Sequence, residues 1–225
     1  MRTLAIGDIH GCSSLLDDLI AWVAPTKHDL VIVLGDVVDR GPDSRGVLDR
    51  LIRLKQELNL VCLRGNHEIM MLEARRGGYG DRKMWMSVGG LQALGSYGTS
   101  PGRTGTLADV PEEHWQFLEK KLLPYYETES HIFVHAGLAQ SLPLSEQPAE
   151  KLYWEHLPAA MQHDSGKIAI CGHTSQKNGV PKVIPGAICI DTFAHGGGWL
   201  TCLDVQSGRY WQTDILGRKR EGQLE

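Results

Sequence analysis

The sequence predicts an α/β fold with a β-α-β-α-β core near its amino end. Three short apolar runs, at 3–6, 30–34 and 60–63, have the length and composition of buried strands. The two stretches between them repeat apolar residues at helical spacing, and each has room for one crossover helix. Each apolar run also ends in a polar segment that contains glycine. Because ligands of open α/β sheets bind beyond the carboxyl ends of strands, these segments predict a single site.

The two crossover helices have recognisable ends. Ser13 or Ser14 can cap the first helix, and Pro25 ends it. Asp43 or Ser44 can cap the second helix in the same way. Since each boundary falls between two apolar runs, the helices and strands are predicted to alternate as a parallel sheet requires.

The second half of the chain adds further elements to this core. A helix is predicted over 115–123, and strands over 131–134 and 167–170. Polar residues follow both strands closely, namely His135 after the first and His173 after the second. Two histidines from the later half are therefore expected at the same edge as the three earlier segments.

The remaining segments are predicted less sharply. Residues 77–105 are rich in glycine, and their pattern assigns no element. Short strands with Gly and Pro turns over 180–213 indicate an antiparallel meander. Residues 217–225 are polar and are expected to form a frayed tail. Without an internal repeat or linker, 1–216 is predicted to be a single domain.

Composition limits the classes of function. The chain has 225 residues, 42% of them apolar and 22% charged, with a formal net charge of −4. This balance lacks the clustered positive charge that nucleic-acid binding needs, so no nucleic acid partner is expected. No apolar run reaches the roughly 20 residues of a membrane span, so no membrane partner is expected. We expect a monomer.

The cysteines and the amino end predict the compartment. The five cysteines are odd in number, widely spaced and mostly within apolar runs, which indicates reduced thiols in a core. Residues 1–4 lead directly into the first strand, which leaves no room for a cleavable signal. These observations predict a cytoplasmic protein.

Six polar side chains follow predicted strands and form the candidate ligand set. They combine carboxylates, imidazoles and one amide, which suits Mn, Fe or Zn, whereas an all-oxygen set would favour Mg or Ca. The absence of cysteine at these positions argues against a structural zinc site. The predicted ligands are Asp8, His10, Asp36, Asn66, His135 and His173.

Six protein ligands are too many for one open catalytic ion, and they predict two ions that share a carboxylate. Asp36 is the predicted bridge, because it follows the central strand of the three. Asp8 and His10 would complete the first position with Asp36. The second position would use Asp36 together with Asn66, His135 and His173. Such a pair, roughly 3.5–4 Å apart, can hold a bridging hydroxide and bind phosphate oxygens.

The other motif residues fit catalytic and substrate-binding roles. Arg40 has a planar fork suited to phosphate. His67 is predicted to donate a proton to the leaving oxygen, and Asp39 to hydrogen-bond His67, fix its tautomer and raise its pKa. Asn66 is expected to contact substrate as well as metal. His195 lies beside a glycine run, where it is either a substrate-binding residue or an ordinary loop histidine.

The motifs resemble those of the phosphoprotein phosphatase family of calcineurin-like metallophosphoesterases, especially its short bacterial and phage members. The family pattern GDxHG, GDxVDRG, GNHE is matched at 7–11, 35–41 and 65–68 without a substitution. Later matches lie at 134–138 and 172–174, and at the last active-site segment, 190–198. The resemblance covers roughly residues 3–204. It implies a central β-sandwich flanked by α-helices, a dinuclear centre often active with Mn, and phosphomonoester hydrolysis without a phosphoenzyme.

The chain departs from the family in one stretch. Members usually carry a second phosphate-binding Arg between the two late histidine motifs, often just after a Trp. Here the stretch is Tyr153-Trp154-Glu155-His156, without Arg. The candidates to replace the missing arginine are Lys151, His156, His163, Lys167, Arg103 and Arg75.

Two functions and a rival class follow from these residues. The first is a Ser/Thr protein phosphatase, with phosphoprotein or phosphopeptide as partner and phosphotyrosine and small aryl phosphates as further substrates. Its reaction would be direct attack by the bridging hydroxide. The alternative is a symmetrical diadenosine tetraphosphate hydrolase or another nucleotide phosphohydrolase. Those dinucleotide hydrolases typically lack an equivalent of Asp39 and carry Asp where Glu68 stands, which favours the phosphatase. A metal-binding adaptor without activity is disfavoured by the intact His67, Asp39 and Arg40.

Histidines and tryptophans outside the motifs are expected to be structural. His28, His114 and His131 are predicted at the surface. The six tryptophans are predicted to pack in the core rather than to stack on nucleobases.

Overall fold

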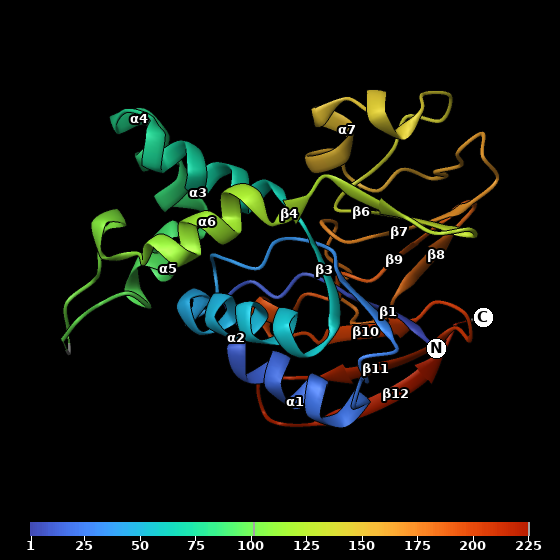
Figure 1. The fold of residues 1–225 in the computed structure, drawn as a ribbon, viewed down its shortest axis with the longest axis horizontal. Helices are drawn as coiled ribbons and strands as arrows, with labels where there is room; N and C mark the ends of the chain where they lie inside the picture. Colours follow the sequence, from blue (N-terminus) through green and yellow to red (C-terminus); the bar gives the residue numbers. More distant parts are fainter. Residues whose placement is uncertain (101, 225) are drawn as a thin grey trace.

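A computed structural model describes residues 1–100 and 102–224. Two β-sheets pack face to face with helices outside them (Figure 1). This arrangement confirms the predicted α/β class with a central sandwich flanked by helices. No helix in the described ranges is both long and apolar enough to cross a membrane.

The larger sheet contains the predicted β-α-β-α-β core. Its order is β12-β11-β10-β1-β2-β3-β4. Strands β1, β2, β3 and β4 run parallel to one another, and β10, β11 and β12 extend the sheet beyond β1 in antiparallel pairs. The strands are β1 Thr3–Ile6, β2 Leu30–Val33, β3 Asn59–Leu63, β4 Leu122–Leu123, β10 Leu200–Asp204, β11 Arg209–Thr213 and β12 Lys219–Gln223.

The smaller sheet has the order β5-β6-β7-β9-β8 and delivers the two late histidines. Strands β6, β7 and β9 are parallel, whereas β5 and β8 pair antiparallel at the edges. The meander predicted over 180–213 is therefore divided: β8 and β9 lie in this sheet, and β10 and β11 in the other. The strands are β5 Tyr125–Glu127, β6 His131–Val134, β7 Ile168–Cys171, β8 Lys182–Ile184 and β9 Ala187–Cys189.

The described residues form seven α-helices, which lie around the sandwich. Helices α1 and α2 lie against the larger sheet, α3 to α6 gather at one end of it, and α7 lies over the smaller sheet (Figure 1). The glycine-rich stretch 77–105 is helical in large part, with a π-helical turn at Met86–Gly90. The α-helices are α1 Ser13–Val23, α2 Ser44–Glu57, α3 Asn66–Arg76, α4 Tyr79–Trp85, α5 Leu91–Gly95, α6 Glu112–Lys120 and α7 Ala149–Tyr153.

The continuous apolar runs are explained by burial of both faces of each strand. On β1 and β2, Ala5 and Ile32 pack between the sheets against Phe133 and Ile170. Their neighbours along the same strands face the helices, so a run without alternation is required. The sandwich therefore holds the carboxyl ends of β1, β2, β3, β6 and β7 near one another.

The helix caps agree with the prediction at one of the two helices. Asp43 caps α2 by accepting a hydrogen bond from Gly46 N at 2.9 Å. Within the described residues, α1 has no side-chain cap, so the capping roles predicted for Ser13 and Ser14 are wrong. The Ser13 hydroxyl instead donates to the Asp43 carboxylate at 2.6 Å. This contact links the starts of the two helices.

The predicted frayed tail is wrong for most of its length. Lys219–Gln223 form β12, paired in register with β11. Arg220 explains the ordering: its guanidinium donates to Gln212 Oε1 and Gly179 O, and it lies 4.1 Å from the centre of the Trp199 ring. A strand held by backbone pairing and polar contacts carries no apolar pattern in its sequence.

Several expected environments are also corrected. His114 and His131 are buried rather than at the surface. The ring of His114 bridges Tyr97 Oη and Asp49 Oδ1, each at 2.9 Å. Trp154 is 36% exposed and so does not belong to the core. The polar partners of His114 come from distant segments, which a local sequence pattern does not reveal.

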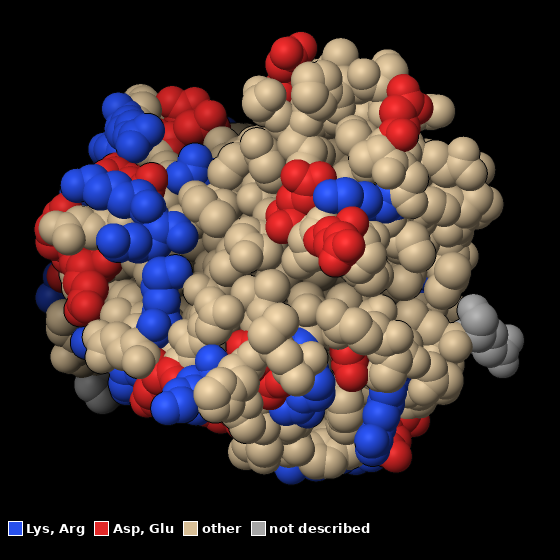
Figure 2. Space-filling view, turned by 45° about the vertical axis from the view of Figure 1, so that its right-hand side comes forward, with Lys and Arg blue, Asp and Glu red and all other residues tan. Residues whose placement is uncertain are grey.

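Charges of both signs mix on the face shown in Figure 2. Lys and Arg side chains at the left of that view lie among Asp and Glu, whereas the upper right is largely uncharged. Independently of that view, helices α3 and α6 are joined by ion pairs such as Arg75–Glu112 and Arg76–Glu119, both at 3.0 Å. Arg75 is thus neutralised within the helical end of the molecule.

Asp29→Asn is expected to destabilise the fold by about 1–3 kcal/mol at pH 7, because a buried charged acceptor is lost. Asp29 accepts hydrogen bonds from the Arg2 backbone, the Arg2 guanidinium and Thr26. The Arg2 hydrogen bond holds the pKa of Asp29 well below its usual range, against the opposing effect of burial. This stability is therefore present above the unfolded pKa of about 4 and is lost as pH falls towards the folded pKa.

Urea unfolding at pH 7 and pH 3 measures this effect. The difference between wild type and Asp29→Asn should shrink at the lower pH. Asp17→Asn is the control, since Asp17 pairs with Arg50 but is 60% exposed. Equal free energies of unfolding for the two variants at pH 7 would contradict the role of Asp29.

Candidate metal centre

The loops that follow β1, β2 and β7 carry the predicted residues in unusual backbone conformations. His10, Asp36, Asp39, Arg40 and His173 all have positive φ, between 45° and 70°. Such conformations are costly for residues other than glycine, and they persist where the surrounding structure holds them. Their concentration in these loops marks the carboxyl edge of the sandwich as a functional site.

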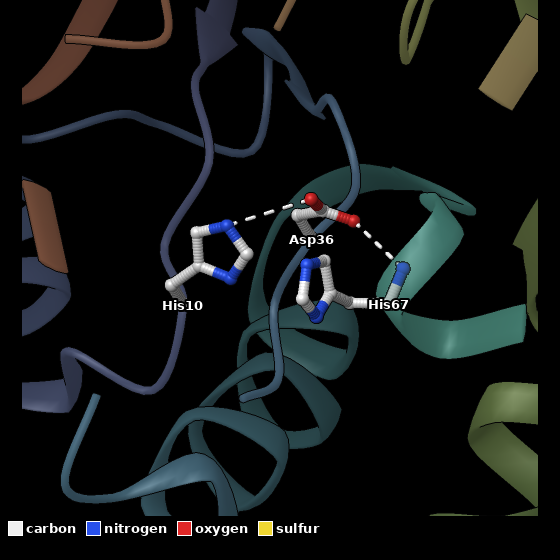
Figure 3. A group of neighbouring side chains, drawn as sticks. All are labelled: His10, Asp36 and His67. Atoms are coloured by element: carbon white, nitrogen blue, oxygen red, sulfur yellow. Dashed lines mark hydrogen bonds and ion pairs between the residues drawn. The ribbon is translucent and has the colours of Figure 1, made fainter. Parts of the chain in front are cut away.

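The first group of potential ligand atoms is formed by His10, Asp36 and His67 (Figure 3). Ligand atoms of these three residues all lie within 4.8 Å of one another, and all three side chains are buried. His10 Nε2 lies 3.4 Å from Asp36 Oδ2, and Asp36 Oδ1 accepts the backbone N–H of His67 at 3.1 Å. The loops after β1 and β2 and the start of α3 thus meet at one point.

The second group is formed by Asp36, His135 and His173. His135 Nε2 lies 3.4 Å from Asp36 Oδ1 and 3.1 Å from the Asn66 side-chain amide. In one of its two orientations, the Asn66 amide nitrogen also lies 3.2 Å from His173 Nδ1. The residues predicted for the second ion therefore converge, and Asp36 belongs to both groups as a bridge would.

Asp8 is a predicted ligand that belongs to neither of the two groups formed by the described residues. His67, not Asp8, completes the first group in the part of the chain that the structure describes. The Asp8 carboxylate accepts the backbone N–H of His173 at 3.0 and 3.2 Å. A Cβ at Gly172 would lie 2.0 Å from Asp8 Oδ1, so only glycine allows this approach. Asp8 lies beside the centre, and its role as a ligand stays a prediction.

Backbone carbonyls orient two of the imidazoles. His10 Nδ1 contacts Val38 O, and His135 Nδ1 contacts Leu34 O, each at 2.9 Å. In a neutral imidazole, an Nδ1–H that donates to a carbonyl leaves the lone pair on Nε2, and Nε2 of both rings is turned towards Asp36. This arrangement is typical of metal-binding histidines.

Glu68 shapes the loop that carries the bridge. Its buried carboxylate accepts four backbone N–H groups, from Gly65, Asp36, Val37 and Val38, at 2.8–3.2 Å. A Cβ at Gly65 would lie 2.1 Å from Asp36 Oδ1, which explains the glycine before Asn66. From the sequence, Glu68 was used only to compare the phosphatase with the dinucleotide hydrolase and was assigned no structural role, although its place as the last residue of the third motif was a signal.

His67 and Asp39 form the predicted pair beside the first group. His67 Nδ1 lies 2.8 Å from Asp39 Oδ2, and both side chains are buried. His67 Nε2 is buried without a hydrogen-bond partner among the described residues. The tautomer held by Asp39 thus leaves a nitrogen available at the site, as a proton donor requires.

The pKa values of Asp36, His67 and Asp8 shift in different directions. Burial raises the pKa of Asp36, but the neighbouring His135, His67 and His10 outweigh it, so the net pKa lies below the usual range. For His67, burial lowers the pKa, yet Asp36 and the hydrogen bond to Asp39 bring it above the ordinary value. Burial raises the pKa of Asp8 well above normal, with Asp191 and Asp36 adding to the effect. His67 therefore keeps a proton more readily than an ordinary histidine.

The predicted substrate-binding residues surround the first group. Arg40 Nη1 lies 3.1 Å from His10 Nε2. The ring of His195 lies against that of His10, with centroids 4.6 Å apart. His195 Nδ1 is buried, and no described residue pairs with it. The geometry therefore places His195 at the site rather than in a remote loop.

Of the six candidates for the missing arginine, His156 lies next to a predicted ligand. Its ring stacks on His173 with centroids 5.4 Å apart. The others contact partners elsewhere: Lys151 pairs with Glu155, Lys167 with Glu127, Arg103 with Asp109, Arg75 with Glu112, and His163 contacts Leu142 O.

The donor set fits two divalent ions. Carboxylate oxygen and imidazole nitrogen, with a nearby amide, converge in two groups around one shared carboxylate. Backbone carbonyls contact Nδ1 of His10 and His135 and so orient both rings, as is usual for metal-binding histidines. These residues could hold metals.

Comparisons with known proteins agree with this geometry. A family model described as calcineurin-like phosphoesterase matches residues 1–177. Serine/threonine-protein phosphatase 1 of Salmonella typhimurium is 41% identical over 86 residues, which cover 38% of this chain and 37% of that protein. The symmetrical bis(5'-nucleosyl)-tetraphosphatase of Pseudomonas fluorescens Pf-5 is 31% identical over 153 residues, covering 65% and 45%. The chain thus spans less than half the length of these relatives.

Solved structures show the same fold. A metallophosphoesterase from Sphaerobacter thermophilus has a TM-score of 0.59 at 16% identity, over 100% of this chain and 88% of that chain. A cold-active protein-tyrosine phosphatase from a Shewanella species has a TM-score of 0.62 at 18% identity, over 98% and 80%. These likenesses concern the fold, and the match of the family model over residues 1–177, more than half of the sequence, shows that the chain belongs to the calcineurin-like phosphoesterase family.

Proposed function

We propose that this protein is a metal-dependent phosphomonoesterase that acts on phosphoserine or phosphothreonine in proteins, with two Mn²⁺ ions as cofactors. The observation that carries the proposal is the buried Asp39–His67 pair, with 2.8 Å between Oδ2 and Nδ1, beside two ligand groups that share Asp36. Zn and Fe also suit this mixture of ligands.

The proposed ligands are the six sequence-derived residues. When bound, the two ions would supply an activated water and neutralise charge on the phosphate. Arg40, beside His10, would hold the phosphate oxygens with its planar fork. His195, whose ring lies against His10, and Asn66, which lies beside His135, would contact substrate as well.

The chain's own residues supply the proton for the leaving group. Asp39 holds the Nδ1 proton of His67, so Nε2 is the nitrogen that faces the reacting oxygen. The pKa of His67 is raised by Asp36 and by the hydrogen bond to Asp39, so its ring keeps a proton more readily than an ordinary histidine. An alkoxide leaving group, such as a serine oxygen, needs this proton more than an aryl oxide does.

Two residues favour a protein phosphatase over a dinucleotide hydrolase. The hydrolases that the motifs resemble typically lack Asp39 and have Asp in place of Glu68. Here Asp39 contacts His67, and Glu68 reaches four backbone N–H groups, a span that suits its longer side chain.

The alternative is a symmetrical diadenosine tetraphosphate hydrolase. The longer curated match, over 153 residues, is to a protein of that name, and the match to a Ser/Thr phosphatase spans 86. The two proposals make the same metal centre act on different substrates.

A substrate comparison tests the proposal. After chelation, the protein is given Mn²⁺, Zn²⁺ or Mg²⁺ and assayed on a phosphoserine peptide, p-nitrophenyl phosphate and diadenosine tetraphosphate. We expect Mn²⁺ to give the highest activity, and kcat/KM on the peptide to exceed that on the dinucleotide by about tenfold or more, which is ~1.4 kcal/mol in the barrier. The reverse order of substrates would support the alternative, and cleavage of none would contradict both.

A further inference from the structure

The Asp39 carboxylate has a second partner besides His67. The indole nitrogen of Trp85 donates to both carboxylate oxygens, at 3.0 Å to Oδ1 and 2.9 Å to Oδ2. Asp39, His67 and Trp85 are all fully buried, so these hydrogen bonds are shielded from water. Because Trp85 lies 46 residues after Asp39, the sequence motifs gave no sign of the contact.

The backbone after Trp85 braces the same loop. In the π-helical turn Met86–Gly90, the Gly89 carbonyl accepts the N–H of Arg40 at 3.2 Å. A Cβ at Gly89 would lie 2.7 Å from Arg40 N and 3.0 Å from Asp39 Cβ. Asp39 and Arg40 have φ of 70° and 65°, and strained residues of this kind need external support. The segment 85–90 therefore contacts both Asp39 and Arg40.

The indole ring is itself closely packed. Trp85 has no exposed surface, and a Cβ at Gly90 would lie 2.5 Å from Trp85 Cδ2. A pocket of about 500 Å³, lined by Trp85 together with Met86, Leu91, Leu94 and Leu107, lies next to this segment. The hydrogen bonds from the buried ring to Asp39 are therefore held in place by the packing around the ring.

We propose that Trp85 is a positioning residue that fixes the Asp39 carboxylate and, through it, the orientation of the His67 ring. This inference rests on the proposed function, in which His67 donates a proton. A carboxylate held by His67 alone can rotate about its Cβ–Cγ bond. An indole N–H that spans both oxygens restricts this rotation and keeps Oδ2 on His67 Nδ1.

Trp85→Phe tests the proposal because it removes the N–H and keeps an apolar ring. We expect turnover on a phosphoserine peptide to fall about tenfold, a part of the ~10²–10⁴-fold that a general acid contributes. Turnover on p-nitrophenyl phosphate, whose leaving group needs little protonation, should fall less than about twofold. The matched control is Trp115→Phe. Trp115 is buried on α6, and among the described residues its indole donates no hydrogen bond to Asp39.

A double-variant comparison separates positioning from a general structural effect. In a His67→Asn background, Trp85→Phe should cause no further loss on the phosphoserine peptide, because the residue that it positions is already gone. An equal loss on both substrates, or a full additional loss in this background, would overturn the proposal.

A spectroscopic measurement tests the positioning of His67 by Trp85 independently of which substrate the protein hydrolyses. The Nδ1–H proton of His67 is followed by NMR in the metal-free protein, with 3-benzothienylalanine at position 85 as a replacement of similar shape in which sulfur stands in place of the N–H. We expect this resonance to shift or broaden, and Trp115→Phe to leave it unchanged. An unchanged resonance would refute positioning by Trp85, whereas a wild type inactive on all phosphoesters would refute only the proposed function.

Discussion

His67→Asn is expected to lower turnover on a phosphoserine peptide by about 10²–10⁴-fold, the usual contribution of a general acid. The reason is geometric: Asp39 holds Nδ1 at 2.8 Å, and Nε2 is buried without a partner among the described residues. Asparagine keeps a polar side chain of similar reach but has no proton to give at this pKa. Turnover on p-nitrophenyl phosphate should fall much less, because that leaving group departs as a stable anion.

Metal content must be measured with the rates. His67 belongs to one of the two groups of potential ligands, so a loss of metal in this variant would identify it as a ligand instead. We expect elemental analysis to find both ions retained. His114→Asn is the matched control, since His114 is a buried histidine held by Tyr97 and Asp49. Near-normal turnover of His67→Asn on the peptide would remove His67 from the mechanism.

The strands that deliver the site could be predicted because their signals are local. Burial on both faces requires continuous apolar runs, and β1 and β6 were predicted at the positions that the structure shows. The helical end of the molecule could not be predicted in this way. Its glycine-rich segment 77–105 forms α4, a π-helical turn and α5. Two glycines of the turn allow close contacts, Gly89 with Arg40 and Gly90 with Trp85. Such contacts depend on tertiary structure.

The site shows the same division. His10, Asp36 and His135 could be found because each follows a strand that ends at the same edge. Asp8 was predicted by the same rule, and its carboxylate contacts the backbone of His173, so it lies beside the site and its role as a ligand stays a prediction. Trp85 had no signal at all, because its contact with Asp39 joins segments that are distant in sequence.

Asp36→Asn is expected to weaken metal binding at both positions. Asp36 is the residue common to both groups, with Oδ2 3.4 Å from His10 Nε2 and Oδ1 3.4 Å from His135 Nε2. An amide has no negative charge to share between two cations and offers one oxygen instead of two. We expect each affinity to fall by at least the ~10–100-fold that loss of an outer partner costs.

Titration of the chelated protein with Mn²⁺, followed by elemental analysis, measures this loss. Asp204→Asn is the control, because Asp204 is a buried carboxylate that accepts hydrogen bonds from Gln206 N and Ser207 Oγ and belongs to neither group. Two ions bound to Asp36→Asn with wild-type affinity would contradict the bridge. Loss of one ion alone would place Asp36 at a single position. Loss of both would show that one carboxylate joins ligands from the two sheets, because His10 follows a strand of one sheet and His135 a strand of the other.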